Sequence, residues 1–189
     1  MIVGIDEVGR GCWAGPLVAA AVGFSPEVSI PELNDSKKLT AKKRLRLTAE
    51  IKNVTKQIGV GWVWPREINK IGLTESVRLA MWRAYGELSI ESTEVIIDGS
   101  INYLSQLKNS TAIIKADGSV PVVSAASIIA KVARDSYMQE ISKKYPNYGF
   151  ESHVGYGTKL HIEALQAYGI LPIHRVGYKP IKKLLASRA

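Results

Sequence analysis

The first 24 residues, MIVGIDEVGRGCWAGPLVAAAVGF, constrain the fold more than any other segment. Two runs of β-branched or small apolar residues, at 1–5 and 16–24, flank a glycine-rich turn. Such runs are typical of buried strands that pair as a hairpin. Asp6 and Glu7 end the first run beside this turn. Either these acids repel any phosphate at the turn, or a positive charge lies between the acids and the phosphate.

The rest of the chain alternates between helical and strand patterns. Apolar spacing predicts helices over 39–53, 74–88, 124–145 and 158–168, and strands over 54–64, 94–99 and 111–118. This order predicts an α/β fold with a central mixed sheet flanked by helices. We interpret 1–189 as one domain, in which a hinge-like segment at 148–157 leads to a small C-terminal helical subdomain at about 150–189.

Composition indicates the class of partner. The chain carries 25 Lys and Arg against 17 Asp and Glu, a net charge of +8, which favours nucleic acid or another polyanion. A single cysteine, Cys12, excludes an internal disulfide and agrees with a reducing compartment. No signal-peptide pattern or run near the roughly 20 apolar residues of a membrane helix is present. We therefore expect a soluble cytoplasmic protein.

Acids end three of the predicted strands: Asp6 and Glu7, then Asp98, then Asp117. Ligand sites of α/β sheets lie at strand ends, so these acids are candidates for one pocket. Carboxylates packed together repel one another unless a cation such as Mg²⁺, which prefers oxygen ligands, lies between them. A two-metal phosphoryl-transfer site would need this arrangement. Alternatively, an Asp before a Gly is often only a turn residue.

The turn also fits a second pattern. GRGCWA matches the G-x-G-x-x-A form of a dinucleotide-binding fingerprint, with Asp35 as the ribose acceptor. Three features argue against it: Pro16 follows closely, the next segment reads as a strand, and Asp6 and Glu7 would face the diphosphate. A non-catalytic nucleic-acid-binding module is another alternative, because it needs the basic charge but not the carboxylates.

Further polar residues are candidates for substrate contact. Ser124, Ser127 and Lys131 fall within about 60° of one another on the predicted helix, which suits either a phosphate-binding face or a helix-packing face. Asn34, Lys37 and Lys38 lie in a turn-like segment, and Tyr156 could stack on a base or sugar or pack under its own loop. His153, His161 and His174 lack zinc spacing.

Five segments then resemble one family. GIDEVGRGCWAGP, LNDSKKL, VIIDG, KADGSVPVVSAASIIAKVARD and GYGTKLHIEAL occur in the order found in ribonuclease HII, and the resemblance spans nearly the whole chain. It implies a ribonuclease H-like fold and cleavage 5′ of a ribonucleotide, in RNA·DNA hybrids or embedded in duplex DNA. The products would carry a 3′-hydroxyl and a 5′-phosphate, and the biological role would be ribonucleotide removal from DNA.

The resemblance also implies residue roles. Asp6, Glu7, Asp98 and Asp117 would hold two Mg²⁺ or Mn²⁺ ions. Gly9, Arg10 and Gly11 would read the 2′-hydroxyl, and Tyr156 would stack on the next sugar. The nucleic-acid backbone would be held by Asn34, Lys37, Ser124, Ser127 and Lys131.

The chain departs from the family pattern in places. Cys12 and Trp13 stand where family members often have Pro and Leu, and Gly157 stands where they often have Pro. We expect Gly157 to loosen the presentation of Tyr156. The last residues, KKLLASRA, lack the aromatic pair used to dock on a sliding clamp, so we expect no clamp binding by that route. We expect a monomer.

Overall fold

The computed structural model describes residues 1–186. A five-stranded sheet in the order β3-β2-β1-β4-β5 forms the centre. Its strands are β1 (Ile2–Val8), β2 (Leu17–Phe24), β3 (Ile58–Val63), β4 (Glu94–Asp98) and β5 (Ser110–Ile113). β1 pairs antiparallel with β2, which pairs antiparallel with β3, whereas β4 and β5 continue the sheet in parallel from β1. The predicted hairpin and mixed sheet are confirmed.

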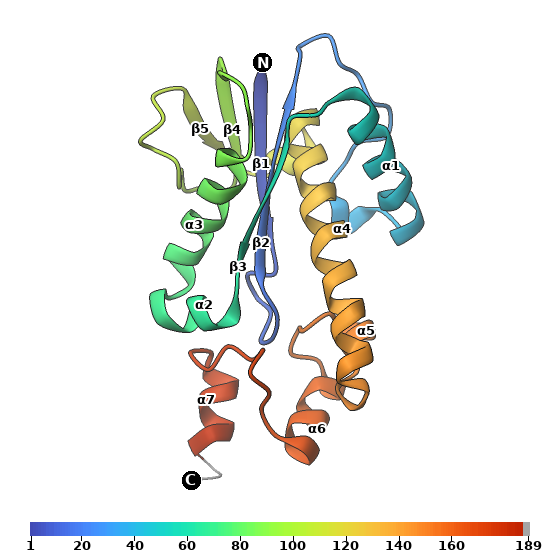
Figure 1. Ribbon diagram of the computed structural model, residues 1–189, viewed down its shortest axis with the longest axis vertical. Coiled ribbons are helices and arrows are strands. Elements are labelled where there is room, and N and C mark those ends of the chain that lie inside the picture. Colours follow the sequence, from blue (N-terminus) through green and yellow to red (C-terminus); the bar gives the residue numbers. More distant parts are fainter. Residues whose placement is uncertain (187–189) are drawn as a thin grey trace.

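Helices cover both faces of the sheet (Figure 1). On one face lie α2 (Pro65–Ile71) and α3 (Leu73–Gly86), and on the other lie α1 (Ala41–Val54) and α4 (Pro121–Lys144). Beyond the far end of α4 come α5 (Phe150–His153), α6 (Lys159–Tyr168) and α7 (Lys179–Ala186). Three short 3₁₀ turns are η1 (Ser36–Lys38), η2 (Ala116–Gly118) and η3 (Pro146–Tyr148). Within residues 1–186, no helix combines the length and apolarity needed to cross a membrane.

The core has three parts. Val3 and Ile5 of β1 pack toward α3, whereas Ala20 and Val22 of β2 pack toward α1 and α4. Every residue of β2 is buried, because helices cover both of its faces. A third cluster joins the end of α4 to α5, α6 and α7, with Phe150 at its centre. The C-terminal helices thus have an apolar core of their own.

Several element boundaries differ from the sequence expectations. β3 begins at Ile58 and not at residue 54, because α1 runs on to Val54. β5 ends at Ile113 and alternates in exposure, so the expectation of a buried strand over 111–118 was wrong: β5 is an edge strand. The short helix α2 was not predicted; the Glu67 side chain caps it by accepting from the Trp64 N–H at 2.9 Å.

Two glycines allow α3 to approach β3. A Cβ atom on Gly61 would lie 1.9 Å from the Ala80 carbonyl oxygen, and one on Gly59 would lie 2.0 Å from that of Ala84. Both neighbours are helix backbone, which cannot move aside as a flexible side chain can. The lack of a side chain at Gly59 and Gly61 therefore allows the short distance between α3 and the sheet.

We expect Gly61→Ala to lower the free energy of unfolding by about 3 kcal/mol, because the added methyl overpacks the contact between α3 and β3. The melting temperature should fall by roughly 10 °C. Urea unfolding and thermal melts measure both. Gly86→Ala is the matched control: Gly86 ends the same helix and its Cβ would meet nothing within 4 Å, so we expect no loss. Equal effects of the two changes would contradict this account.

Candidate active site

Strand pairing brings two of the predicted acids together. β1 and β4 are parallel neighbours with Ile5 opposite Ile97, so Asp6 and Asp98, the next residue on each strand, lie side by side. Asp117 does not end a strand as expected, but lies in η2 after β5. Its backbone N–H donates to the Asp98 carboxylate at 3.3 Å. One carboxylate oxygen from each of the three residues lies within 4.8 Å of the other two.

Glu7 lies beside this cluster and not within it. Successive strand residues point to opposite faces, so Glu7 cannot follow Asp6 inward. Its carboxylate lies 3.7 Å from the Arg10 guanidinium. Glu7 nevertheless lines the same cavity of about 340 Å³ as Asp6, together with Lys131 and Tyr156. The structure therefore brings three of the four predicted acids together and leaves Glu7 at their edge.

The carboxylates are held in an unfavourable electrostatic state. Burial raises the pKa of Asp6 well above its ordinary value, and the charges of Glu7 and Asp98 raise it further. Burial also raises the pKa of Asp117, with Asp98 adding to the effect. A positive charge among these oxygens would relieve the repulsion. Clustered carboxylate oxygens are the ligands that Mg²⁺ and Mn²⁺ prefer, so the residues fit a hard divalent cation.

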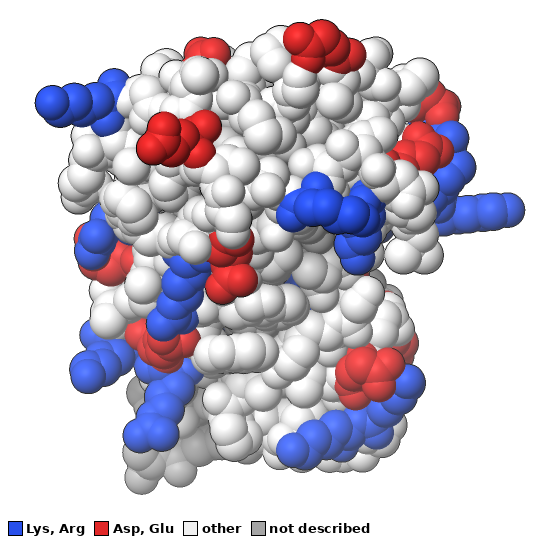
Figure 2. Space-filling model, turned by 45° about the horizontal axis from the view of Figure 1, so that its top comes forward, with Lys and Arg blue, Asp and Glu red and all other residues white. Residues whose placement is uncertain are grey.

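Residues of the segment before α1 border the acidic cluster. The Lys37 ammonium lies 3.9 Å from an Asp117 carboxylate oxygen, and its side chain is 75% exposed. Asn34 accepts from the Asp35 N–H at 2.8 Å, and Asp35 accepts from the Lys37 N–H at 2.9 Å. These two bonds order the turn that carries Lys37. Over the face in Figure 2, basic and acidic side chains are interspersed.

Arg44 of α1 was missed by the sequence analysis. Its guanidinium donates to the backbone carbonyls of Ser36 at 3.0 Å and Leu39 at 2.6 Å. It also lines the cavity next to Asp6. In the sequence, Arg44 is one of several basic residues on a predicted helix, and nothing there distinguishes it from its solvent-exposed neighbours.

The three candidate residues on α4, Ser124, Ser127 and Lys131, differ in exposure. Ser124 and Ser127 are buried, and the Ser124 hydroxyl donates to the Asp117 carbonyl at 2.7 Å. The Ser127 hydroxyl lies 2.9 Å from that of Ser36 and hydrogen-bonds the Asp6 carboxylate, which lowers the pKa of Asp6. Lys131 pairs with Asp135 at 2.9 Å and lines the cavity. The two serines thus support the segments that carry the acids.

The Gly9-Arg10-Gly11 turn is held from its inner side. Gly9 has φ +88°, and a Cβ there would lie 2.3 Å from Nε of Arg134. The Gly9 carbonyl accepts from Arg175 at 2.7 Å, and the Arg10 carbonyl accepts from the Tyr178 hydroxyl at 2.5 Å. The turn therefore has a defined shape that only glycine allows at position 9.

Two fully buried arginines tie the turn to the C-terminal part of the chain. Arg134 donates to the carbonyls of Pro16 at 2.9 Å, Ala14 at 3.1 Å and Val154 at 2.9 Å. Arg175 donates to Gly15 at 3.0 Å as well as to Gly9. Sequence analysis missed both. For Arg134 a signal existed, because it falls on the apolar side of α4 four residues before the buried Met138.

Tyr156 lies next to this turn and is 39% exposed. Its ring lies 3.7 Å from the place where Gly11 would carry a Cβ. Burial raises the pKa of the Cys12 thiol, and the interaction of that thiol with the Tyr156 hydroxyl lowers it. The tip of Tyr156 thus interacts with a residue of the turn.

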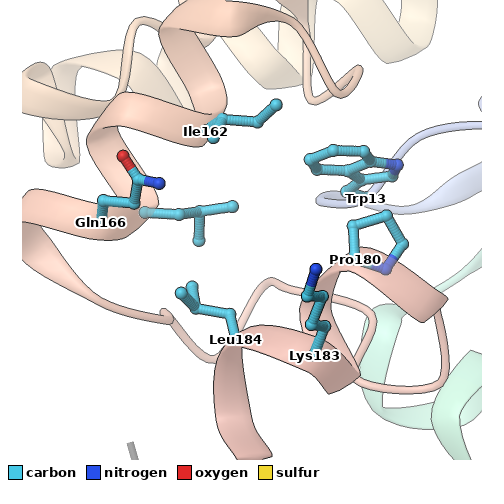
Figure 3. A pocket seen from close by; sticks show the side chains of 7 residues that line it. Trp13, Ile162, Gln166, Pro180, Lys183 and Leu184 are labelled. Atoms are coloured by element: carbon cyan, nitrogen blue, oxygen red, sulfur yellow. The ribbon is translucent and has the colours of Figure 1, made fainter. Parts of the chain in front are cut away.

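Gly157, the residue after Tyr156, packs closely against Trp13, and the expected looseness of Tyr156 stays a prediction. A Cβ on Gly157 would lie 2.1 to 2.6 Å from three atoms of the Trp13 indole, so the glycine packs directly on that ring. The Trp13 backbone N–H donates to the Gly155 carbonyl at 2.8 Å. Trp13 also borders a cavity of about 410 Å³ between α6 and α7 (Figure 3). The large residue at 13 and the missing side chain at 157 are complementary.

The dinucleotide alternative is not supported. The residues after the glycine-rich turn form β2, so no helix N-terminus is available there for a diphosphate. Asp35, its expected ribose acceptor, caps η1 instead.

We expect Asp6→Asn to raise the stability of the protein in EDTA at pH 7.5 by at least about 1 kcal/mol, the value of one pKa unit. Asn removes a buried charge that Glu7 and Asp98 repel. The melting temperature should rise by about 2 to 4 °C. Because the pKa of folded Asp6 is raised, the difference should vanish below about pH 3.9, where both states are protonated.

Glu140→Gln is the matched control, because Glu140 is an exposed carboxylate on α4 that pairs with Lys143 at the surface. It should change stability by less than about 0.5 kcal/mol. A lower melting temperature for Asp6→Asn than for the wild type in EDTA would contradict the repulsion.

We expect Gly157→Ala to cost about 1 to 3 kcal/mol in the wild type, because its methyl overlaps the Trp13 ring. In a Trp13→Leu background the same change should cost at least about 1 kcal/mol less. Urea unfolding of the four proteins measures this coupling. Additive effects would show that the two residues do not share this space.

Known proteins are similar to this chain in sequence and in structure. The family model for ribonuclease HII matches residues 3–181. Relatives named ribonuclease HII include one from Bacillus cereus (strain Q1), 49% identical over 97% of this chain and 71% of that protein, and one from Bacillus thuringiensis (strain Al Hakam), 48% identical over the same shares.

Solved structures of the same family have the same fold as this chain. Ribonuclease H2 from Pyrococcus horikoshii OT3 superimposes with a TM-score of 0.84 at 28% identity, covering 98% of this chain and 97% of that one. RNase HII from Archaeoglobus fulgidus, solved in complex with PCNA, gives 0.76 at 30% identity, covering 97% and 96%. The expected ribonuclease H-like fold is confirmed. With a family model that spans almost its whole length, the chain belongs to the ribonuclease HII family.

Proposed function

We propose that this protein is a divalent-metal-dependent endoribonuclease that hydrolyses the phosphodiester 5′ of a ribonucleotide. Its substrates would be RNA·DNA hybrids and duplex DNA with single embedded ribonucleotides, and the products would carry a 3′-hydroxyl and a 5′-phosphate. The observation that carries the proposal is the cluster of Asp6, Asp98 and Asp117 oxygens within 4.8 Å of one another, beside a glycine turn and an exposed tyrosine. Membership of the family supports ribonuclease activity.

Asp6, Asp98 and Asp117 would hold two Mg²⁺ or Mn²⁺ ions, with Glu7 completing the set from the edge. When bound, such ions supply Lewis-acid charge at the reacting phosphate and ease ionisation of the attacking water. The three aspartates fix the place of that charge because Asp6 and Asp98 lie on paired strands. Ser127 and Ser124 would act beneath them, the first on the Asp6 carboxylate and the second on the Asp117 backbone.

The glycine turn would select the ribonucleotide. The carbonyls of Gly9 and Arg10 are engaged on the inner side by Arg175 and Tyr178. The Cys12 N–H donates to the Gly9 carbonyl at 3.3 Å, and the N–H groups of Arg10 and Gly11 would be the donors that meet a 2′-hydroxyl, the one group that distinguishes RNA from DNA at a position. The Tyr156 ring, which lies beside Gly11, would stack on the neighbouring sugar.

Rim residues would hold the nucleic-acid backbone. Lys37 and Lys131 border the carboxylates and can approach phosphates, and Asn34 lies in the same turn as Lys37. The net charge of +8 supports attraction of a polyanion.

The biological role would be removal of ribonucleotides from DNA. The Archaeoglobus fulgidus relative was solved in complex with PCNA. For this chain, the absence of clamp docking through a C-terminal aromatic pair stays a prediction, and its last residues, 187–189, lie outside the described part.

A labelled DNA duplex with one embedded ribonucleotide tests the proposal. We expect a single cut immediately 5′ of the ribonucleotide with Mg²⁺ or Mn²⁺, none with EDTA, and none in an all-DNA duplex. Cutting of the all-DNA duplex would refute selection by the 2′-hydroxyl. Tight binding without any cut would indicate the non-catalytic module.

We expect Asp98→Asn to lower the cleavage rate at least about 100-fold, since even residues that only orient metal ligands often cost that much. Binding of the duplex in EDTA should be kept or tightened, because a negative charge facing phosphate is removed. Rates come from single-turnover cleavage and affinities from fluorescence anisotropy. Cleavage at the wild-type rate would remove Asp98 from the site.

A further inference from the structure

Three histidines lie buried behind the Tyr156 loop. His153 ends α5, His161 lies in the first turns of α6, and His174 precedes α7. Their exposed fractions are 6%, 0% and 1%. The rings of His153 and His161 stack with centroids 4.5 Å apart, and Phe150 packs edge-on against both. Neither the acidic cluster nor the glycine turn accounts for these imidazoles.

The cluster is uncharged near neutral pH. Burial lowers the pKa of His161 and of His174 to about 4, and it also lowers the pKa of His153. A neutral imidazole has one N–H and one acceptor nitrogen. Each ring can therefore donate only one hydrogen bond, and the partners decide which nitrogen donates.

The hydrogen-bond partners leave one consistent arrangement for His161. Its Nδ1 lies 2.9 Å from the Tyr156 carbonyl, which can only accept, so Nδ1 carries the proton. Nε2 of His161 is then an acceptor. It lies 3.1 Å from Nε2 of His174, which must supply the proton between them.

The arrangement for His174 follows. With its proton on Nε2, its Nδ1 must accept, and the Leu171 N–H donates to it at 2.8 Å. The Leu171 carbonyl also lies 3.1 Å from Nδ1 of His174. A proton on that Nδ1, however, would point at the Leu171 N–H and would leave no proton between the Nε2 atoms of His161 and His174. The result is one directed chain, from the Leu171 N–H through His174 and His161 to the Tyr156 carbonyl.

We propose that His161, in the tautomer that His174 imposes, is a positioning residue that fixes the Tyr156 backbone for substrate contact. The Tyr156 carbonyl also accepts from the Thr158 backbone N–H at 2.9 Å, and the Tyr156 backbone N–H donates to the His153 backbone carbonyl at 2.9 Å. Cys12 interacts with the Tyr156 hydroxyl. The imidazole chain is the link that joins these local contacts to the segment before α7. The role of Tyr156 in this proposal rests on the proposed function.

Two substitutions at one position separate positioning from simple packing. In His161→Asn the side-chain amide can stand where Nδ1 stood and keep the bond to the Tyr156 carbonyl. In His161→Gln the amide reaches instead toward the place of Nε2 and loses that bond. Both remove the ring stacking. We expect His161→Gln to raise KM for the ribonucleotide-containing duplex about tenfold with kcat within twofold, and His161→Asn to stay within about twofold of wild type in both.

A double-mutant cycle adds a second test. In a Tyr156→Ala background, where the ring is gone, His161→Gln should raise KM by less than twofold further. Equal KM values for the Asn and Gln variants, or a tenfold effect that persists without the Tyr156 ring, would overturn the proposal.

The tautomers can be measured without activity. Nitrogen-15 NMR of the wild-type imidazoles at pH 7 should show His161 protonated at Nδ1 and His174 at Nε2. The opposite tautomer in either ring would overturn the chain even if the enzyme cleaves. If the wild type cuts no ribonucleotide-containing duplex while these tautomers are found, the proposed function fails and the hydrogen-bond chain stands.

Discussion

The parallel pairing of β1 with β4 places Asp6 beside Asp98, and much of the structure around the site follows from that pairing. Two carboxylates at adjacent strand ends repel each other, and η2 adds Asp117 to them. The fold tolerates this because the acids end buried strands that the sheet holds in register. The apolar core therefore stabilises a charge arrangement that is unfavourable by itself, and the same arrangement is suited to a divalent cation.

The other side of the site depends on buried arginines. Arg134 and Arg175 donate to carbonyls of the 9–16 turn, and of these the Gly9 carbonyl also accepts from the Cys12 backbone N–H. A guanidinium has several donors in a fixed plane, so one side chain can serve several carbonyls. Because Arg134 also binds the Val154 carbonyl, the turn and the Tyr156 loop share one anchor. The C-terminal helices thus contribute to a site whose acids come from earlier parts of the chain.

The Tyr156 loop contacts residues both near and distant in sequence. Cys12 meets the Tyr156 hydroxyl, Trp13 fills the space left by Gly157, and His161 meets the Tyr156 carbonyl. The Trp13 contact needs the missing side chain at Gly157, and the Tyr156 carbonyl contact needs the neutral imidazole of His161. We therefore expect a change at one of these positions to affect the others, because the loop and the turn pack against each other.

The sequence by itself determined most of the local elements and identified the acids of the candidate site. Apolar runs that end in acids identified β1, β4 and their aspartates, and helical spacing identified α1, α3, α4 and α6. Tertiary structure alone decided that β5 lies at an edge, that Asp117 reaches the cluster from a 3₁₀ turn, and that Arg134 and Arg175 are buried. Local patterns record the periodicity of one segment. Burial, pairing and the tautomer of His161 depend on contacts with other segments, up to 168 residues away, which meet only in the folded chain.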